Sequence, residues 1–144
     1  MTKKRNSPLK LYRQKGEDCW RYALAHLLKL HPKKVPRFDP HDSDYISKTR
    51  AWLKRKYKKG LVYVPASQFN ETEHPKYNPA GYPCGECICA MLVEVDGCVD
   101  KGIYGHAAFC FDGVIHEHRD TCCEKVISIL GYFILYDLQV MVVD

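Results

Sequence analysis

The chain has 144 residues, of which 46% are hydrophobic and 27% are charged, as in an ordinary globular domain. That composition excludes disorder, collagen-like repeats and coiled coils, and the length favours one domain over residues 1–144 with a flexible basic tail at 1–8. The longest mostly apolar stretch, 126–143, is interrupted by polar residues and is unsuited to a membrane-spanning helix, so we expect no membrane partner.

Charge divides the sequence into two unlike parts. The first 60 residues contain 18 lysines and arginines and 5 acidic residues, whereas residues 61–144 contain 4 and 12. This asymmetry is typical of proteins that bind nucleic acid or membrane surfaces, but it also arises when a basic helical half packs beside an acidic sheet half. We favour the second interpretation, with the two halves forming the two walls of one site.

Eight cysteines occur in a chain whose basic start is not followed by the apolar segment of a secretory signal peptide. We therefore expect a reducing, cytoplasmic compartment. In such a compartment, thiols are catalytic, metal-bound or buried rather than joined in disulfides.

The first half of the chain has the apolar period of helices. One helix is predicted to start at the N-cap Asp18 and to end near Leu30. A second helix is predicted from a cap at Asp42 or Ser43 to a stop at Gly60. The apolar positions that define these helices are Trp20, Ala23, Leu24, Leu27 and Leu28 in the first, and Tyr45, Ile46, Thr49, Trp52, Leu53 and Tyr57 in the second.

After residue 60 the pattern changes to that of strands. Strands are predicted at 61–64, 88–95, 107–111, 114–116 and 132–136, and a long loop is predicted at 66–83. The pair Asp112-Gly113 is a strong signal for a two-residue hairpin turn. Helices followed by antiparallel strands predict an α+β fold.

A candidate nucleophile lies at the start of the first predicted helix. Cys19 falls in the first turn, where free amide groups and the helix dipole favour a thiolate. Gln14, five residues upstream, can donate its side-chain amide to an oxyanion together with the main-chain N–H of Cys19. The alternative is a small buried cysteine and a solvated glutamine.

A candidate base, His106, opens the strand predicted before the hairpin turn. A histidine held by a sheet can face a helix terminus and accept the proton of a thiol. Counting back across a two-residue turn places Glu117 opposite Ala108, on the same face as His106. The Glu117 carboxylate can therefore reach the imidazole, while His116 and His118 are expected on the other face.

These residues resemble the papain-like cysteine peptidases, in particular their compact bacteriocin-processing type. The stretch 16–28, followed by Val35-Pro36 and by the pair Trp52-Leu53, is similar to small uncharacterised phage and bacterial proteins of that fold. The resemblance extends loosely over residues 9–136 and is specific in three short segments.

The resemblance implies a papain-like α+β domain in which N-terminal helices pack on a C-terminal antiparallel sheet. It implies a thiol-dependent acyl-transfer hydrolase, a peptidase or isopeptidase with a protein or peptide substrate, phage-encoded and active in the cytoplasm of a bacterial host. Its catalytic residues would be Cys19, His106, Glu117 and Gln14, and the reaction requires no cofactor.

The third member of the proposed triad departs from the pattern of these relatives. They carry His-Asp-Pro where this chain carries His116-Glu117-His118, so the acid at this position is one methylene longer. Asp112 is the alternative acid, although its place in the predicted turn suits a structural role better.

A second group of cysteines suggests a metal site. Cys84, Cys87 and Cys89 are close together in the sequence, and Cys122 follows later. Four thiolates, or three and a histidine, can hold a structural Zn²⁺ in tetrahedral geometry, although this spacing matches no standard zinc knuckle. The alternative is that Cys87 and Cys89 are ordinary strand residues.

The second predicted helix carries seven basic residues and no acidic residue over 48–59. Such a face suits phosphate contacts or an acidic protein substrate, and it is most often simply solvated. It supports a rival hypothesis, a non-catalytic protein on the same scaffold, with or without zinc, that inhibits a host protein or binds nucleic acid. Nucleic acid is the less favoured partner because no aromatic platform accompanies the basic residues.

Overall fold

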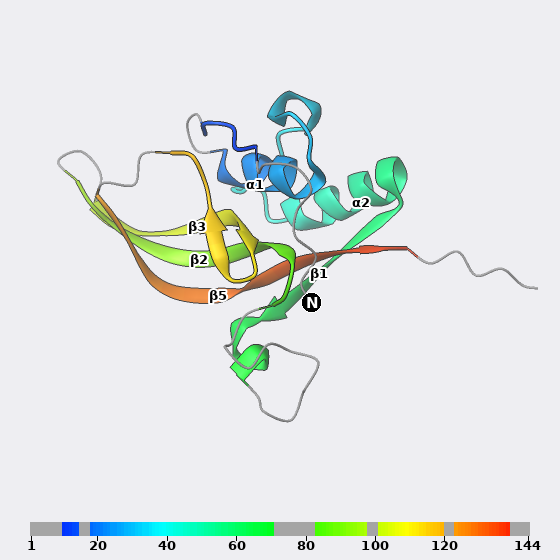
Figure 1. The fold of residues 1–144 in the computed structure, drawn as a ribbon. Coiled ribbons are helices and arrows are strands. Elements are labelled where there is room, and N and C mark those ends of the chain that lie inside the picture. The colour runs from blue at the N-terminus through cyan, green and yellow to red at the C-terminus, as the bar shows by residue number, and fades with distance from the viewer. Residues whose placement is uncertain (1–9, 15–17, 71–82, 98–100, 120–122, 139–144) are drawn as a thin grey trace, which may run out of the picture.

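The computed structural model describes residues 10–14, 18–70, 83–97, 101–119 and 123–138, which form two α-helices and one sheet. In chain order the elements are α1 (Cys19–Leu28), the 3-10 helix η1 (Pro32–Lys34), α2 (Tyr45–Tyr57), β1 (Lys59–Pro65), the 3-10 helix η2 (Ala66–Asn70), β2 (Glu86–Asp96), β3 (Lys101–Phe111), β4 (Val114–His116) and β5 (Glu124–Asp137). The strands pair antiparallel in the order β1-β5-β2-β3-β4 (Figure 1). The predicted α+β class is therefore confirmed.

Two further predictions are the flexible tail at the N-terminus and the lack of a membrane partner. The tail predicted at 1–8 lies outside the described residues. Neither α1 nor α2 has the length and the apolar character that a helix needs to cross a membrane.

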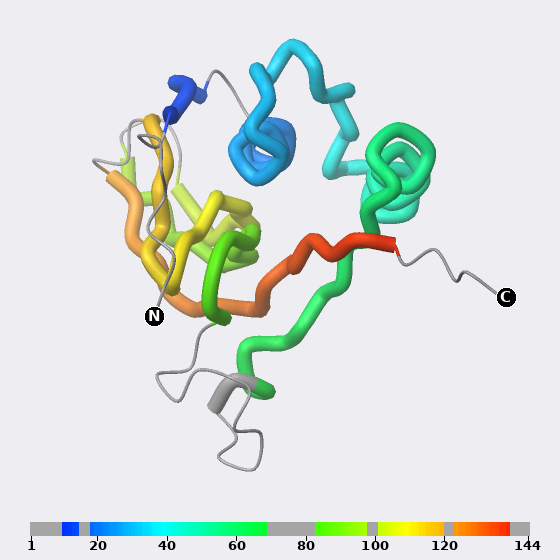
Figure 2. The backbone as a smooth tube through the Cα atoms, turned by 45° about the vertical axis from the view of Figure 1, so that its right-hand side comes forward, coloured from blue at the N-terminus to red at the C-terminus, as the bar shows by residue number. Residues whose placement is uncertain are grey.

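Both helices pack on one face of the sheet (Figures 1 and 2), because each has an apolar stripe of helical period. Trp20 and Leu24 of α1 and Leu53 of α2 form one buried cluster with Ile88 and Phe109 of the sheet. All the apolar positions predicted for the two helices are buried or partly buried in this core.

The helix ends differ from the predictions by one to three residues. α1 stops at Leu28 because Lys29 adopts the left-handed conformation, with φ 60°. α2 begins after Asp44 rather than after residue 42 or 43, and Lys58, with φ 55°, ends it before Gly60. Helix ends depend on the conformation of one residue, which an apolar period does not specify.

Asp18 precedes α1 as predicted, but its side chain makes no capping hydrogen bond. Its Oδ1 instead accepts a hydrogen bond from Arg37 Nε at 2.8 Å. The carboxylate therefore ties the start of α1 to the segment that follows η1.

Strands β3 and β5 are longer than predicted. β3 begins at Lys101, so His106 lies in the middle of a strand and not at its start. β5 begins at Glu124 rather than at residue 132. Residues 101–105 and most of 123–130 are exposed, so these parts lack the alternating burial on which the strand predictions depend.

The hairpin between β3 and β4 has the predicted register. Phe111 lies opposite Val114, and the two residues between them form the turn. Asp112 and Gly113 both have positive φ, 48° and 82°, as expected for the tight turns that join twisted strands.

The indole of Trp20, the neighbour of Cys19, is held by three contacts. Its Nε1 donates a hydrogen bond to the hydroxyl of Thr49 at 3.0 Å, and that hydroxyl donates to the main-chain oxygen of Tyr45 at 2.7 Å. The rings of Tyr45 and Phe133 meet the indole edge-on, with centroids 5.5 and 5.0 Å away. Thr49 is fully buried, so its hydroxyl has no water to replace these partners.

Replacing this hydroxyl is therefore expected to destabilise the fold. Thr49→Val removes the acceptor of the Trp20 N–H inside the core, and we expect a loss of about 1–3 kcal/mol in the free energy of unfolding. Thr49→Ser keeps the hydroxyl and should lose less, although it also removes a buried methyl group. Guanidinium unfolding measures both, and a larger loss in Thr49→Ser than in Thr49→Val would contradict this account.

Candidate active site

The first turn of α1 presents Cys19 to the middle of β3. The Cys19 thiol is hydrogen-bonded to the side chain of His106 and to the main-chain N–H of Ala107. Burial raises the pKa of Cys19, but these hydrogen bonds, the charge of His106 and the N–H of Trp20 together lower it below the ordinary thiol value. The thiolate of the residue proposed as nucleophile is therefore more stable than that of an ordinary thiol.

His106 is held between Cys19 and a carboxylate. Its Nε2 lies 2.8 Å from Glu117 Oε1, so the predicted contact with Glu117 is confirmed, and Nδ1 is the ring nitrogen that remains for Cys19. Burial disfavours the imidazolium, but hydrogen bonds to Cys19 and Glu117, and the charges of both, raise the pKa of His106 to about 9. Cys19 and His106 thus stabilise each other as a thiolate and an imidazolium.

The hairpin has the register that was predicted to bring the Glu117 carboxylate to His106. His116 lies beside the ring of Phe109, its partner in the ladder, on the face opposite His106. The next residue, Glu117, points back toward His106. Burial raises the pKa of Glu117, but His106 and Arg119 lower it more, which keeps the carboxylate ionised.

Arg119 is a residue of the site that the sequence analysis missed. Its guanidinium contacts Glu117 through Nε and Glu124 through Nη2, and all three side chains are less than one-fifth exposed. Arg119 follows Glu117 by two residues, and this short spacing could have indicated that the two side chains meet. Its second partner, Glu124, begins β5 in the half of that strand that the pattern did not reveal.

Asp112, the alternative acid, does not reach His106. Its Oδ1 accepts a hydrogen bond from the main-chain N–H of Gly85 at 2.6 Å, and its own N–H donates to the Gly85 oxygen at 3.0 Å. Asp112 therefore stabilises the turn, and Glu117 is the acid beside the histidine.

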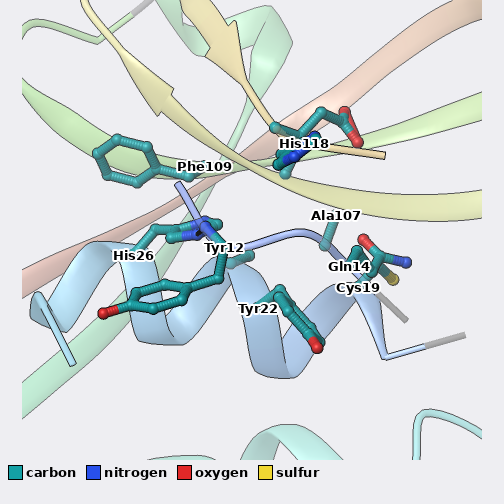
Figure 3. Close-up of a pocket in the computed structure, with 11 residues that line it drawn as sticks. Tyr12, Gln14, Cys19, Tyr22, His26, Ala107, Phe109 and His118 are labelled. Atoms are coloured by element: carbon teal, nitrogen blue, oxygen red, sulfur yellow. Dashed lines mark hydrogen bonds between the residues drawn. The ribbon is translucent and has the colours of Figure 1, made fainter. Parts of the chain in front are cut away.

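Gln14 lies beside Cys19, where the sequence analysis expected an oxyanion donor (Figure 3). Its main-chain N–H donates to the oxygen of His118 at 2.8 Å, and Arg13 forms an isolated parallel bridge with His118. The segment before α1 is thus attached to the chain just after β4, close to Glu117.

Two cavities share Cys19 and His106 in their walls. The larger, of about 420 Å³, is also lined by the polar side chains of Gln14, Tyr104, Arg119 and Glu124. The smaller, of about 310 Å³, is otherwise mainly apolar, with Trp20, Ala90, Met91, Leu130 and Phe133 among its lining residues. A molecule could reach the cysteine–histidine pair from surroundings of two different polarities.

The two halves of the chain form the walls of this site, as our interpretation proposed, but the basic charge of the first half does not line it. The strongly charged side chains that line the two cavities, Arg119 and Glu124, both belong to the acidic half. The basic residues of α2 mostly face solvent, and Lys48 pairs with Asp42 and Asp44. The net charge of each half therefore does not predict which charged side chains line the site, because burial selects individual side chains.

The proposed zinc ligands do not gather within the described residues. Cys87 and Cys89 are buried on one face of β2, and Cys84 is exposed before the strand. Cys87 is hydrogen-bonded to Cys110, its cross-strand partner, and its pKa is raised by this bond and by burial. No three potential ligands converge in the described part of the chain, and Cys122 lies outside it. Cys87 and Cys89 are therefore buried core residues of β2, as the alternative interpretation expected.

Comparison of the chain with protein-family models, with curated proteins and with solved structures finds no match.

The protonation states of the pair have a direct experimental signature. Cys19 should react with iodoacetamide at about pH 6, where an ordinary thiol is protonated, because its thiolate is stabilised by His106. In His106→Ala the labelling of Cys19 at this pH should become much slower, and Cys84 and Cys123, which are exposed thiols of the same chain, are the internal references. Intact mass and peptide mapping measure the rates, and uniform slow labelling of all three would rule the pair out.

Titration of His106 distinguishes the two acids. Glu117 raises the pKa of His106, so Glu117→Gln should shift the NMR titration of this imidazole from about 9 to lower pH. Asp112→Asn keeps the acceptor of the turn and should leave the His106 titration in place. Equal shifts in the two variants would show that Glu117 has no special role.

Proposed function

We propose that this protein is a papain-like thiol-dependent acyl-transfer hydrolase, a peptidase or isopeptidase, with Cys19 as nucleophile. The single observation that carries the proposal is the hydrogen-bonded series of Cys19, His106 and Glu117, in which α1 supplies the thiol and the hairpin supplies the base and the acid. The order of Gln14, the cysteine, the histidine and the acid along the chain is the order of the papain-like family.

The chemistry follows from the charges of the site. The Cys19 thiolate would attack a carbonyl carbon, and the oxygen that becomes negative would receive hydrogen bonds from Gln14 and from the Cys19 main-chain N–H. His106, already protonated in the resting pair, would give its proton to the leaving amine. Water, deprotonated by His106, would then release the acyl group and restore the thiolate.

Glu117 and Arg119 would support this cycle without touching the reacting atoms. Glu117 holds the ring of His106 at Nε2, which leaves Nδ1 toward the thiol. Arg119 keeps Glu117 ionised, and burial of the three side chains strengthens their interactions because water screens them less. An ionised acid in turn favours the imidazolium that the leaving group needs.

A peptide or isopeptide bond is the reaction class that we favour. The two cavities beside Cys19, of about 420 and 310 Å³, leave room for side chains next to the scissile bond. A phage-encoded protein that acts on a protein of its bacterial host remains the setting that we propose.

Turnover and a covalent intermediate test the proposal together. Wild-type protein should be acylated on Cys19 by p-nitrophenyl acetate and should cleave denatured casein. Cys19→Ala should lose both reactions, whereas Cys123→Ala, which removes an exposed thiol, should keep them. Gln14→Ala should lower the rate about a hundredfold, because it removes one oxyanion donor.

A different set of results would favour the non-catalytic rival. In that case the wild-type protein is not acylated by the ester and does not cleave casein. Binding of a host protein or nucleic acid then persists in Cys19→Ala and is lost when Lys54, Arg55 and Lys58 of α2 are changed to glutamate.

A further inference from the structure

A buried histidine, His26, has no part in the chemistry proposed above. It lies in the third turn of α1 and is 6% exposed. A buried polar side chain must find a hydrogen-bond partner inside the protein, or its burial destabilises the fold. The partner of His26 therefore indicates what this residue does.

That partner is the main chain of the segment that carries Gln14. His26 Nε2 accepts a hydrogen bond from the main-chain N–H of Tyr12 at 3.0 Å. The ring of Tyr12 is stacked on the imidazole, with centroids 6.1 Å apart and planes 9° apart. The Phe109 ring of β3 contacts the same imidazole edge-on at 6.1 Å, which limits the positions that the ring of His26 can take.

The bond with Tyr12 requires neutral His26, because only an unprotonated Nε2 can accept it. Burial lowers the pKa of His26, which favours the neutral form at ordinary pH. The ring therefore acts as a fixed acceptor.

Helix geometry aligns this acceptor with the nucleophile. His26 follows Cys19 by seven residues, close to two full turns, so both side chains lie on the face of α1 that packs against β3. Seven residues of helix span about 10 Å. Two residues of extended chain span about 7 Å, so a segment that lies beside His26 at Tyr12 comes near Cys19 at Gln14. Figure 3 shows Tyr12 next to His26 and Gln14 next to Cys19.

We infer that His26 is a positioning residue, which holds the main chain at Tyr12 so that the side-chain amide of Gln14 lies beside the Cys19 thiol. The hydrogen bond from Gln14 N–H to the oxygen of His118 is a second attachment of the same segment. α1 thus carries the nucleophile at its first turn and, two turns later, the group that places the oxyanion donor. This inference rests on the proposed function only for the role of Gln14.

A double-mutant cycle tests the coupling. His26→Leu removes the acceptor and should lower acylation by p-nitrophenyl acetate by about the same factor as Gln14→Ala, about a hundredfold. The double variant should be no slower than Gln14→Ala alone, because both changes remove the same donor. His26→Gln offers an oxygen acceptor and should recover most of the rate.

Two further readouts separate positioning from general damage to the fold. The rate of Cys19 alkylation by iodoacetamide should stay unchanged in His26→Leu, because the bond with His106 is intact. His31→Ala is the matched control, since His31 touches the Tyr12 ring edge-on at 4.7 Å but is exposed, and it should behave as wild type. Multiplicative losses in the double variant, or slower alkylation in His26→Leu, would overturn the inference.

Hydrogen–deuterium exchange tests the attachment without any turnover. Amides of residues 10–14 should exchange faster in His26→Leu and at the wild-type rate in His26→Gln. Unchanged exchange in His26→Leu overturns the attachment. Faster exchange in a protein that the ester never acylates would support the attachment and contradict the proposed function, so the two failures are distinguishable.

Discussion

The hydrogen bond between Cys19 and His106 is the interaction on which the candidate site depends. It joins the first turn of a helix to the middle of a strand 87 positions later in the chain, so it can form only if α1 packs across β3. The apolar stripe of α1 produces that packing, and the bond between Trp20 and Thr49 fixes the neighbour of the thiol against α2. The stability of the core and the geometry of the site therefore have the same origin.

Charge alternates outward from the nucleophile through His106, Glu117 and Arg119 to Glu124. Each of these groups is partly buried, where an unpaired charge is expensive and a paired one is strongly held. The pKa values of Cys19 and Glu117 are lowered, and that of His106 is raised to about 9, because each group stabilises the charged form of its neighbour. The net charge of either half of the chain has no part in this effect.

Much of the site followed from the sequence because the relevant distances are local. The position of Cys19 in a first turn depends on helix period, and the meeting of His106 with Glu117 depends on counting across the two-residue turn. The predictions failed where local pattern carries no signal. The exposed half of β5 has no alternating pattern, so the sequence did not reveal Glu124 as the second partner of Arg119. The side chain of Asp18, predicted to cap α1, instead accepts a hydrogen bond from Arg37.

The sequence by itself determined the α+β class, the two helix stripes, the register of the hairpin and the identity of the candidate nucleophile and base. Those features depend on residues a few positions apart, whose relative geometry is set by helix and strand periods. Only the tertiary structure decided that Glu117 rather than Asp112 serves His106, that Arg119 joins the pair, and that His26 holds Tyr12. Each of these choices depends on which polar groups become buried together, because burial makes a hydrogen-bond partner obligatory, and burial is a property of the packed chain.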